Sequence, residues 1–397
     1  MVCVAYAKEI GNGLVTLHGD QDEEVLKKAA HTYAIIIAVL SFYVLDFTLN
    51  AVQAICRALI LDIPPLWQQD IANAWSARMS NCAMVVGYFV GFVDLVKYLP
   101  WLGDSQMKVF CIVGITVFCI TLAITCFFIT EKKLERDDQD EQPWYQVFVY
   151  IWRAFRFLPR PVQTLCNTQF FAWMGWFPFL FYSTQWVSDI YFQTHPGDPT
   201  DGNWAEGTRA GSFALLCYSV VSVIANLVLP MLTNKFEDKI RLFSLLNLYT
   251  ISHLIVAAAL LSAWFVRSVM GATIVLAIMG IPWAIVLWIP FSLVGEFVSF
   301  EEHRRQTANN NSSSTSSARV EDQQDEFDAG MILGVHNMYV VFPQFAVAVI
   351  SSFIFAAADA VAGDKKNDPS SVASVLAFGG LMAIVAAGFS RSVIRVK

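Results

Sequence analysis

The chain has 397 residues, of which 56% are hydrophobic and only 15% are charged, and its mean hydropathy is +0.51. Soluble domains carry about 25% charged residues, so this composition excludes an ordinary soluble protein and indicates a polytopic membrane protein. The net charge of −7 gives no sign of nucleic-acid binding. The eight cysteines show neither paired nor metal-ligand spacing, which argues against a disulfide framework and a metal site.

Nine stretches are long and apolar enough to cross a bilayer, for which about 20 residues are needed. They are residues 32–61, 79–98, 107–130, 166–188, 210–233, 242–266, 270–296, 330–358 and 372–390. Residues 1–17 are a poorer tenth candidate, because glycines interrupt them and they contain Lys8 and Glu9. We interpret them as the end of a helix whose beginning is absent. The sequence therefore predicts an all-α polytopic membrane protein with about nine complete transmembrane helices.

Basic side chains in the loops set the orientation of these helices. They are concentrated in residues 131–165, 234–241 and 391–397, so the positive-inside rule places these three segments in the cytoplasm. The polar, low-complexity segment 297–329 falls on the same side and is expected to be disordered. By the same parity, residues 189–209 lie outside.

One apolar stretch, 42–62, carries four polar residues on a single helical face. Asp46, Asn50, Gln53 and Arg57 are spaced i, i+4, i+7 and i+11, which places them within an arc of about 60°. A charge near the middle of a spanning helix costs about 2.5–3.5 kcal/mol. The polar stripe therefore predicts a water-lined pathway rather than lipid contact, and makes this helix the centre of a hypothetical solute transporter.

Each polar residue of this helix has a functional and a structural interpretation. Asp46 is the candidate proton carrier, because a desolvated carboxyl can bind and release a proton near neutral pH; the alternative is a structural carboxylate paired with a neighbouring helix. Arg57 either donates a fork of hydrogen bonds to a hydroxylated ligand or clamps a carboxylate between helices. Asn50 and Gln53 suit ligand hydroxyls but also join membrane helices. Asp62 lies off the stripe, where we expect it to gate or cap the cytoplasmic mouth.

A second stretch, 170–186, combines helix-breaking residues with aromatic side chains. Gly175 and Pro178 are expected to bend or break this helix, and broken helices are common at transporter binding sites. The aromatic residues around them are Trp173, Trp176, Phe177, Phe179, Tyr182 and Trp186.

Aromatic faces such as those of Trp176 and Phe177 can cover the apolar face of a sugar ring. Ser183 and Gln185 could then hydrogen-bond the sugar hydroxyls. The alternative is an aromatic belt at the membrane interface, which suits Trp186 near the outer end equally well.

Two later helices repeat this pattern more faintly. Residues 281–296 contain two prolines and end at Glu296, a candidate gating or structural residue. In the next helix, Asn337 and Gln344 are candidate sugar contacts, while His336 is either packed or functional.

No Ser-His-Asp set, Walker loop, G-x-G-x-x-G turn or metal-ligand cluster stands out. The chain is therefore not expected to be an enzyme. No cofactor is expected beside the proton as co-substrate.

Four motifs resemble those of the sucrose transporters. They are LDFTLNAVQAICRALILD (45–62), similar to the family's fourth helix, WMGWFPFLFYSTQW (173–186), similar to the seventh, GIPWAIVLWIPFSLVGE (280–296), similar to the tenth, and GVHNMYVVFPQ (334–344), similar to the eleventh. The motif WQQDIANAWSARM (67–79) resembles the fungal branch, the sucrose and general α-glucoside permeases. These matches occur in order across nearly the whole chain.

The resemblance implies the major facilitator fold, with twelve helices in two six-helix domains and sugar import driven by proton symport. It implies that residues 1–130 are a partial N-terminal domain containing a remnant of helix three and helices four to six. Residues 131–165 would be a central cytoplasmic loop and 166–397 the C-terminal six-helix domain. In this alignment Asp46 matches the family's proton-coupling carboxylate and Arg57 its fourth-helix arginine, and the sugar would bind near the midplane between the domains.

The chain departs from the plant pattern at two places and at its start. The plant pattern has Asp at the positions of Ser183 and Gln185, and an Arg-Glu pair where this chain has only Asp189, which bears on substrate choice. The first two helices and most of the third have no counterpart, so an N-terminal truncation is expected.

Two hypotheses follow: a proton-coupled importer of sucrose or maltose, or a non-transporting sugar sensor or inactive fragment. Expected partners are the sugar, protons and the lipid bilayer of the plasma membrane, with the vacuolar membrane as the alternative, and no nucleic acid.

Overall fold

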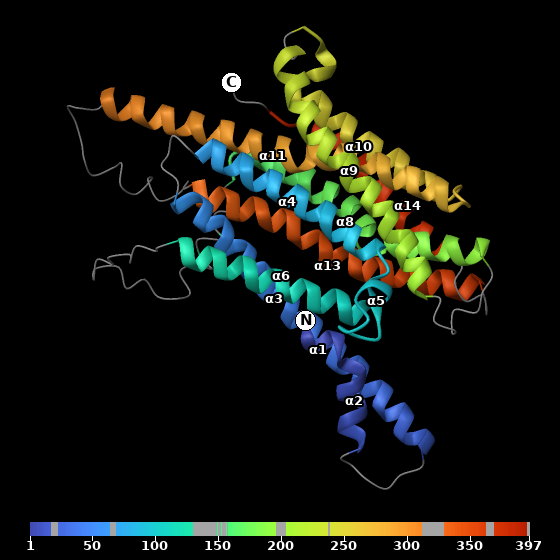
Figure 1. The fold of residues 1–397 in the computed structure, drawn as a ribbon. Helices are drawn as coiled ribbons and strands as arrows, with labels where there is room; N and C mark the ends of the chain where they lie inside the picture. Colours follow the sequence, from blue (N-terminus) through green and yellow to red (C-terminus); the bar gives the residue numbers. More distant parts are fainter. Residues whose placement is uncertain are drawn as a thin grey trace. The chain divides into compact units, whose positions relative to one another are not determined.

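A computed structural model describes residues 1–16, 23–63, 69–129, 158–195, 204–236, 239–311, 329–362 and 369–394, together with residues 149, 152 and 156. These residues form twelve α-helices, a short 3-10 helix and no strand (Figure 1), which confirms the all-α fold class. The chain divides into two compact units, Met1–Arg136 (unit 1) and Asp137–Lys397 (unit 2).

Seven helices in the described part of the chain are long and apolar enough to cross a membrane. Their spans are Leu26–Gln53, Gln106–Phe128, Ala205–Thr233, Leu245–Ser262, Val269–Gly295, Gly334–Ala358 and Ser370–Ser390. The predicted span 166–188 falls within the helix Arg160–Thr194, and residues 79–92 of the predicted span 79–98 fall within the helix Gln69–Phe92, but neither helix is among these seven.

Unit 1 is built around one very long helix. Its helices are α1 (Val2–Ala5), α2 (Ala7–Thr16), α3 (Glu23–Asp62), α4 (Gln69–Phe92), α5 (Leu95–Tyr98) and α6 (Gln106–Phe128). The predicted span 79–98 is wrong at its end, because α4, which begins at Gln69, stops at Phe92. Asp94 then starts a separate helix, its carboxylate accepting a hydrogen bond from the backbone N–H of Lys97 at 3.3 Å.

The N-terminal residues of unit 1 pack closely on the start of α3. A Cβ atom placed on Gly11 of α2 would lie 2.8 Å from the carbonyl oxygen of Ala30, so only glycine allows the two backbones to approach this closely. At the other side, the ammonium group of Lys108 on α6 forms ion pairs with Glu9 of α2 and, at 2.6 Å, with Asp104.

Unit 2 contains six long helices around a dense core. They are α8 (Arg160–Thr194), α9 (Trp204–Phe236), α10 (Leu245–Ser262), α11 (Val269–Asn311), α13 (Ala329–Ala362) and α14 (Pro369–Ser390), with the 3-10 helix η3 (Arg241–Phe243) before α10. Helix α8 packs against α9, α13 and α14, and α11 packs against α9 and α10. Gly175 and Gly379 set the distance between α8 and α14, since a Cβ on either would lie 2.9 Å from the carbonyl oxygen of the other.

Two helices of unit 2 continue where the sequence predicted an interruption. Helix α8 is a single 35-residue helix with Pro178 inside it, so Gly175 and Pro178 do not break it. Helix α11 (orange in Figure 1) runs through Pro282 and Pro290 and continues to Asn311. It therefore enters the segment 297–329 that was expected to be disordered, while residues 312–328 lie outside the described part of the chain.

Candidate functional site

The polar stripe of unit 1 lies on one continuous helix. Because α3 is uninterrupted from Glu23 to Asp62, the spacing of the stripe holds along its length. Asp46, Asn50 and Gln53 are all exposed. The Asn50 side-chain amide donates a hydrogen bond to the backbone carbonyl of Asp46 at 2.9 Å, and not to its carboxylate.

Exposed side chains of a spanning helix must be surrounded by lipid, by protein or by water. Lipid tails can cover exposed apolar side chains, but an ionisable group in a spanning helix is costly in lipid and normally faces protein or water. A hydrated pathway along the stripe on α3 therefore stays a prediction from the sequence. The side chains of Arg57 and Asp62, which were expected to extend and close this pathway, lie outside the described structure.

The two aromatic residues proposed as sugar contacts on α8 are enclosed by other side chains. Trp176 is 1% exposed, and its ring lies edge-on against Phe179 and Trp283, with centroids 5.6 and 5.0 Å away. Phe177 is 7% exposed and packs in a cluster with Met174. In this arrangement both rings belong to the core of unit 2, and neither offers a free face to a sugar.

Trp186 is also buried, at 1% exposure. This side chain therefore faces the interior of unit 2 and not an interfacial belt. An aromatic belt would leave the ring at the surface of the unit.

Two other tryptophans at the same aromatic cluster are partly exposed. Trp173 of α8 and Trp283 of α11 meet in a T-shaped pair, with ring centroids 6.1 Å apart and an interplanar angle of 72°. Trp173 belongs to the aromatic group expected from the sequence, whereas Trp283 was not predicted. The signal was present, because Trp283 follows Pro282 in a tenth-helix motif, but its neighbours on α8 and α9 are visible only in the fold.

The polar candidates of unit 2 divide into buried and exposed side chains. Ser183 is buried, at 1% exposure, whereas Gln185 is exposed on the same helix. On α13, which packs against α8, Asn337 is exposed and Gln344 is partly exposed. Gln185, Asn337 and Gln344 therefore remain accessible to a ligand.

His336 is 1% exposed, and its ring packs edge-on against Phe291 at 5.2 Å between centroids. This environment fits the packed interpretation of His336. Glu296, the candidate at the end of the tenth-helix motif, lies on α11, but its side chain is outside the described structure.

Polar groups also gather where α8 and α9 meet at the expected outer end. Asp189 is 5% exposed. The Tyr191 hydroxyl donates a hydrogen bond to the Glu206 carboxylate at 2.9 Å, and this bond raises the pKa of Tyr191 above its usual range. A Cβ on Gly207 would overlap the Ser188 hydroxyl oxygen at 2.3 Å, so α9 approaches α8 closely here.

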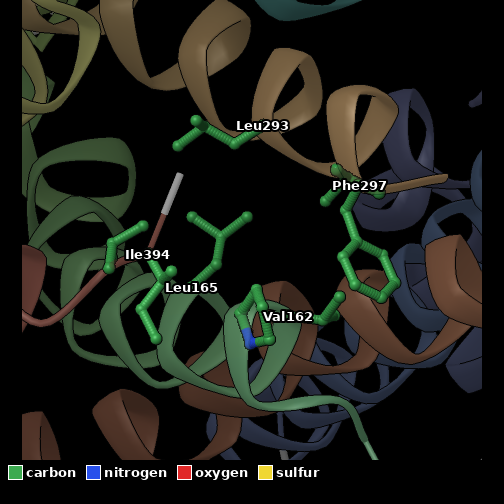
Figure 2. A pocket seen from close by; sticks show the side chains of 8 residues that line it. Val162, Leu165, Leu293, Phe297 and Ile394 are labelled. Atoms are coloured by element: carbon green, nitrogen blue, oxygen red, sulfur yellow. The ribbon is translucent and has the colours of Figure 1, made fainter. Parts of the chain in front are cut away.

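A small crevice lies at the opposite end of unit 2 (Figure 2). It is lined by Pro161, Val162, Leu165, Leu293, Val294, Phe297, Val393 and Ile394. The lining contains only apolar side chains, so it offers a sugar no side-chain hydrogen bond. Val393, which follows α14, is buried in the adjoining core cluster. This crevice is therefore a packing feature rather than a sugar site.

Titratable side chains in the described part of the chain do not form a metal site. No group of three or more His, Cys, Asp or Glu residues lies close enough to hold an ion within that part. The candidate chemistry consequently rests on hydrogen bonds, aromatic faces and the Asp46 carboxyl.

The long apolar helices and the exposed polar stripe define an all-α polytopic membrane protein. No protein-family model matches the chain. It is 27% identical to a general alpha-glucoside permease of Schizosaccharomyces pombe, in an alignment covering 92% of this chain and 74% of the permease. It is 24% identical to the sucrose transport protein SUT2 of Oryza sativa, over 89% of this chain and 70% of that protein. The sucrose transport protein SUT3 of Oryza sativa is 23% identical, over 96% and 79%.

These comparisons confirm the resemblance found in the sequence. The chain is similar to a fungal general alpha-glucoside permease and to plant sucrose transport proteins. These relatives are transporters, so the expectation that the chain is not an enzyme is also confirmed.

Proposed function

We propose that this protein imports α-glucosides such as sucrose or maltose together with protons. The observation that carries the proposal is the exposed polar stripe of α3, which places Asp46, Asn50 and Gln53 on one face of a spanning helix. The similarity to an alpha-glucoside permease and to sucrose transport proteins supports the choice of substrate.

In this proposal a carboxyl of the stripe carries the proton, and neutral amide groups bind the sugar. Asp46 takes up a proton from the outer side, which removes its charge and lowers the cost of moving this helix face through a dehydrated state. The side-chain amides of Asn50 and Gln53 offer both donors and acceptors to sugar hydroxyls. Arg57, three turns beyond Asp46, supplies a charged donor fork to the same ligand.

Unit 2 contributes accessible polar groups to sugar binding. Gln185 on α8 and Asn337 on α13 are exposed, and Gln344 is partly exposed. From the basic segments we infer that the inner ends of these helices lie in the cytoplasm. We place the protein in the plasma membrane, where an acidic exterior drives import.

Uptake of radiolabelled sucrose and maltose tests the proposal in a yeast that lacks its own glucoside carriers. We expect accumulation that is stronger at outside pH 5 than at pH 7. Asp46→Asn should abolish accumulation against a gradient. The matched control Asp94→Asn, which changes a carboxylate in the outer loop away from the stripe, should preserve it.

Two outcomes contradict the proposal. Accumulation that survives Asp46→Asn unchanged would show that this carboxyl does not couple protons. Sugar binding by purified protein, without uptake from a correctly localised protein, would favour a sugar sensor.

A further inference from the structure

Trp283 lies where three helices of unit 2 meet. Its ring contacts Trp176 and Trp173 of α8, at 5.0 and 6.1 Å between centroids, and Tyr218 of α9, also at 6.1 Å. These contacts hold the Trp283 side chain at the junction while leaving it partly exposed.

Trp173 and Trp283 together form an open corner at this junction. Both are partly exposed, and their rings are inclined at 72°. A pyranose ring has one apolar face and a rim of hydroxyl groups. Two inclined indole rings can therefore cover the face and one edge of the same sugar.

Three buried polar atoms of α8 and α11 have no hydrogen-bond partner in the described part of the chain. They are the indole nitrogens of Trp173 and Trp283 and the side-chain carbonyl oxygen of Gln169. Gln169 precedes Trp173 by four residues on α8, so the two lie on the same helical face. An unpaired buried polar atom is costly, and an edge-on aromatic ring compensates an N–H group only weakly.

The unpaired atoms match the chemistry of a polyol. The two indole N–H groups can act only as hydrogen-bond donors, and the Gln169 oxygen can act only as an acceptor. A sugar hydroxyl can do both. Because all three atoms are shielded from solvent, an indole ring must turn for a hydroxyl to reach them, and this turn should change the tryptophan fluorescence.

The depth of the corner is appropriate for a transported solute. Trp283 lies near the middle of the apolar span Val269–Gly295. Substrate sites of secondary transporters lie near the bilayer midplane. By contrast Trp186, whose indole nitrogen also lacks a partner, is 1% exposed and lies near the outer end of α8.

From these observations we propose that Trp173 and Trp283 form an aromatic sugar-binding corner of unit 2, in place of the enclosed Trp176 and Phe177, and that Gln169, which is 1% exposed, becomes accessible to a sugar hydroxyl when an indole ring turns. The inference rests on the proposed transport of α-glucosides. It assigns the glucosyl ring to the two exposed indoles and its hydroxyls to the three unpaired atoms.

Four substitutions test the corner by uptake kinetics. Trp283→Leu removes the ring and should raise the KM for sucrose and maltose about 10-fold or more. Trp283→Phe and Trp173→Phe keep an aromatic ring but remove the N–H donor, and each should raise KM about 3- to 10-fold. Trp186→Phe is the matched control, since it removes another unpaired indole N–H, and it should leave KM unchanged.

A binding titration on the purified protein makes the result independent of transport rate. Sucrose or maltose should change the tryptophan fluorescence of the unchanged protein, and Trp283→Phe should weaken that response in parallel with KM. If Trp283→Leu fails to fold, the two phenylalanine variants, which retain most of the ring volume, still decide the question.

The outcomes separate this inference from the proposed function. If the unchanged protein transports glucosides and both phenylalanine variants keep its KM and fluorescence response, the corner is not the sugar site although the function stands. If the unchanged protein neither binds nor transports any glucoside, both proposals are wrong. A KM raised equally by Trp186→Phe would also overturn the inference, because the effect would then be general to the tryptophans of unit 2.

Discussion

The two units differ in how much of their apolar helices they bury. In unit 2, the most apolar windows of α10, α11 and α14 are 56%, 50% and 50% buried, and those of α9 and α13 are 28% and 17% buried. In unit 1 the corresponding shares are 11% for α6 and 0% for α3. Helix α3 exposes apolar and polar side chains alike, including Phe47 at 79% exposure. Unit 2 is therefore held together by helix packing, whereas the long helix of unit 1 has little cover from its own unit.

Because of this difference, different observations identify candidate functional residues in the two units. On a helix with little protein cover, lipid can cover apolar side chains, so only polar residues such as Asp46 reveal a face that needs water or protein. In a packed unit, most side chains are explained by the core. The informative residues there are the exceptions to good packing, such as partly exposed Trp283 with its unpaired nitrogen.

The sharpest way to test the comparison is to enlarge a glycine in each unit. A Cβ on Gly280 of α11 would lie 2.5 Å from the carbonyl oxygen of Tyr218 and 2.8 Å from the backbone nitrogen of Ser222. On Gly87 of α4 it would meet nothing within 4 Å. Gly280→Val should therefore destabilise the protein by about 2–3 kcal/mol, while Gly87→Val should change stability by less than about 0.5 kcal/mol.

Thermal unfolding of the purified variants in detergent measures this difference. Equal melting temperatures for Gly280→Val and Gly87→Val would contradict the contrast between a tight and an open unit. Gly280→Ala provides a graded version, since its smaller side chain should give an intermediate effect.

Periodicity and hydropathy were sufficient to predict the helical fold, seven of the spans and the stripe on α3. They failed where packing overrides a local signal. Pro178 predicts a helix break, but α8 continues through this residue because neighbouring helices enclose this part of the chain. The apolar residues on both sides of Asp94 predict one membrane span, but the carboxylate of Asp94 caps a new helix.

Which aromatic ring faces outward could not be predicted from the sequence. Trp173 and Trp176 are three residues apart and chemically identical, yet the first is partly exposed and the second is enclosed by Phe179 and Trp283. That distinction depends on where α11 crosses α8. A single sequence does not contain this crossing point.

A second prediction concerns a hydrogen bond that exists only because unit 2 is packed. The hydroxyl groups of Thr250 on α10 and Ser390 on α14 lie 2.8 Å apart and are buried. Thr250→Val should cost about 1 kcal/mol, because it leaves the Ser390 hydroxyl with one partner fewer. In unit 1, the exposed Thr116 hydroxyl bonds only the carbonyl of Ile112 in its own helix, at 2.9 Å.

Thr116→Val is therefore the control, and it should change the melting temperature less than Thr250→Val. The double variant Thr250→Val with Ser390→Ala should be less destabilising than the sum of the two single changes. Strict additivity would show that the two hydroxyls are not coupled.

A third, smaller effect is expected at the contact that joins α2 to α6 in unit 1. Lys108 pairs with Glu9 and Asp104, and its ammonium lies 5.4 Å from the centre of the Tyr6 ring. Lys108→Ala should allow the N-terminal helices to leave α6 more often, because exposed ion pairs contribute little individually but here form a network. Cys111, which is 6% exposed on α6, should then react faster with a maleimide.

The labelling is read in a variant that keeps only Cys111 and the buried Cys166 of unit 2. Lys97→Ala serves as the matched control, since it removes an outer-loop lysine outside this network. If Cys111 labels equally fast in the Lys108→Ala and Lys97→Ala variants, the ion pairs do not hold the N-terminal helices. Labelling of Cys166 should remain slow throughout.

The smallest expected effect is that of pH on the same contact. Hydrogen bonds from Lys108 hold the pKa of Glu9 and that of Asp104 below their ordinary values of 4.5 and 3.8. A carboxylate with a lowered pKa stabilises the folded contact fully above its ordinary pKa, and this contribution is lost as the pH falls through the lowered value. Labelling of Cys111 with a pyridyl disulfide, which stays reactive in acid, should therefore be constant from pH 7 to 5 and should rise only below 4.5.

Constant labelling between pH 7 and 5 would bear on transport. Stronger uptake at pH 5 could then not come from rearrangement of this contact, and Asp46 would remain the candidate proton carrier. A rise in labelling between pH 7 and 5 would instead make the outer contact of unit 1 a second proton-sensitive element.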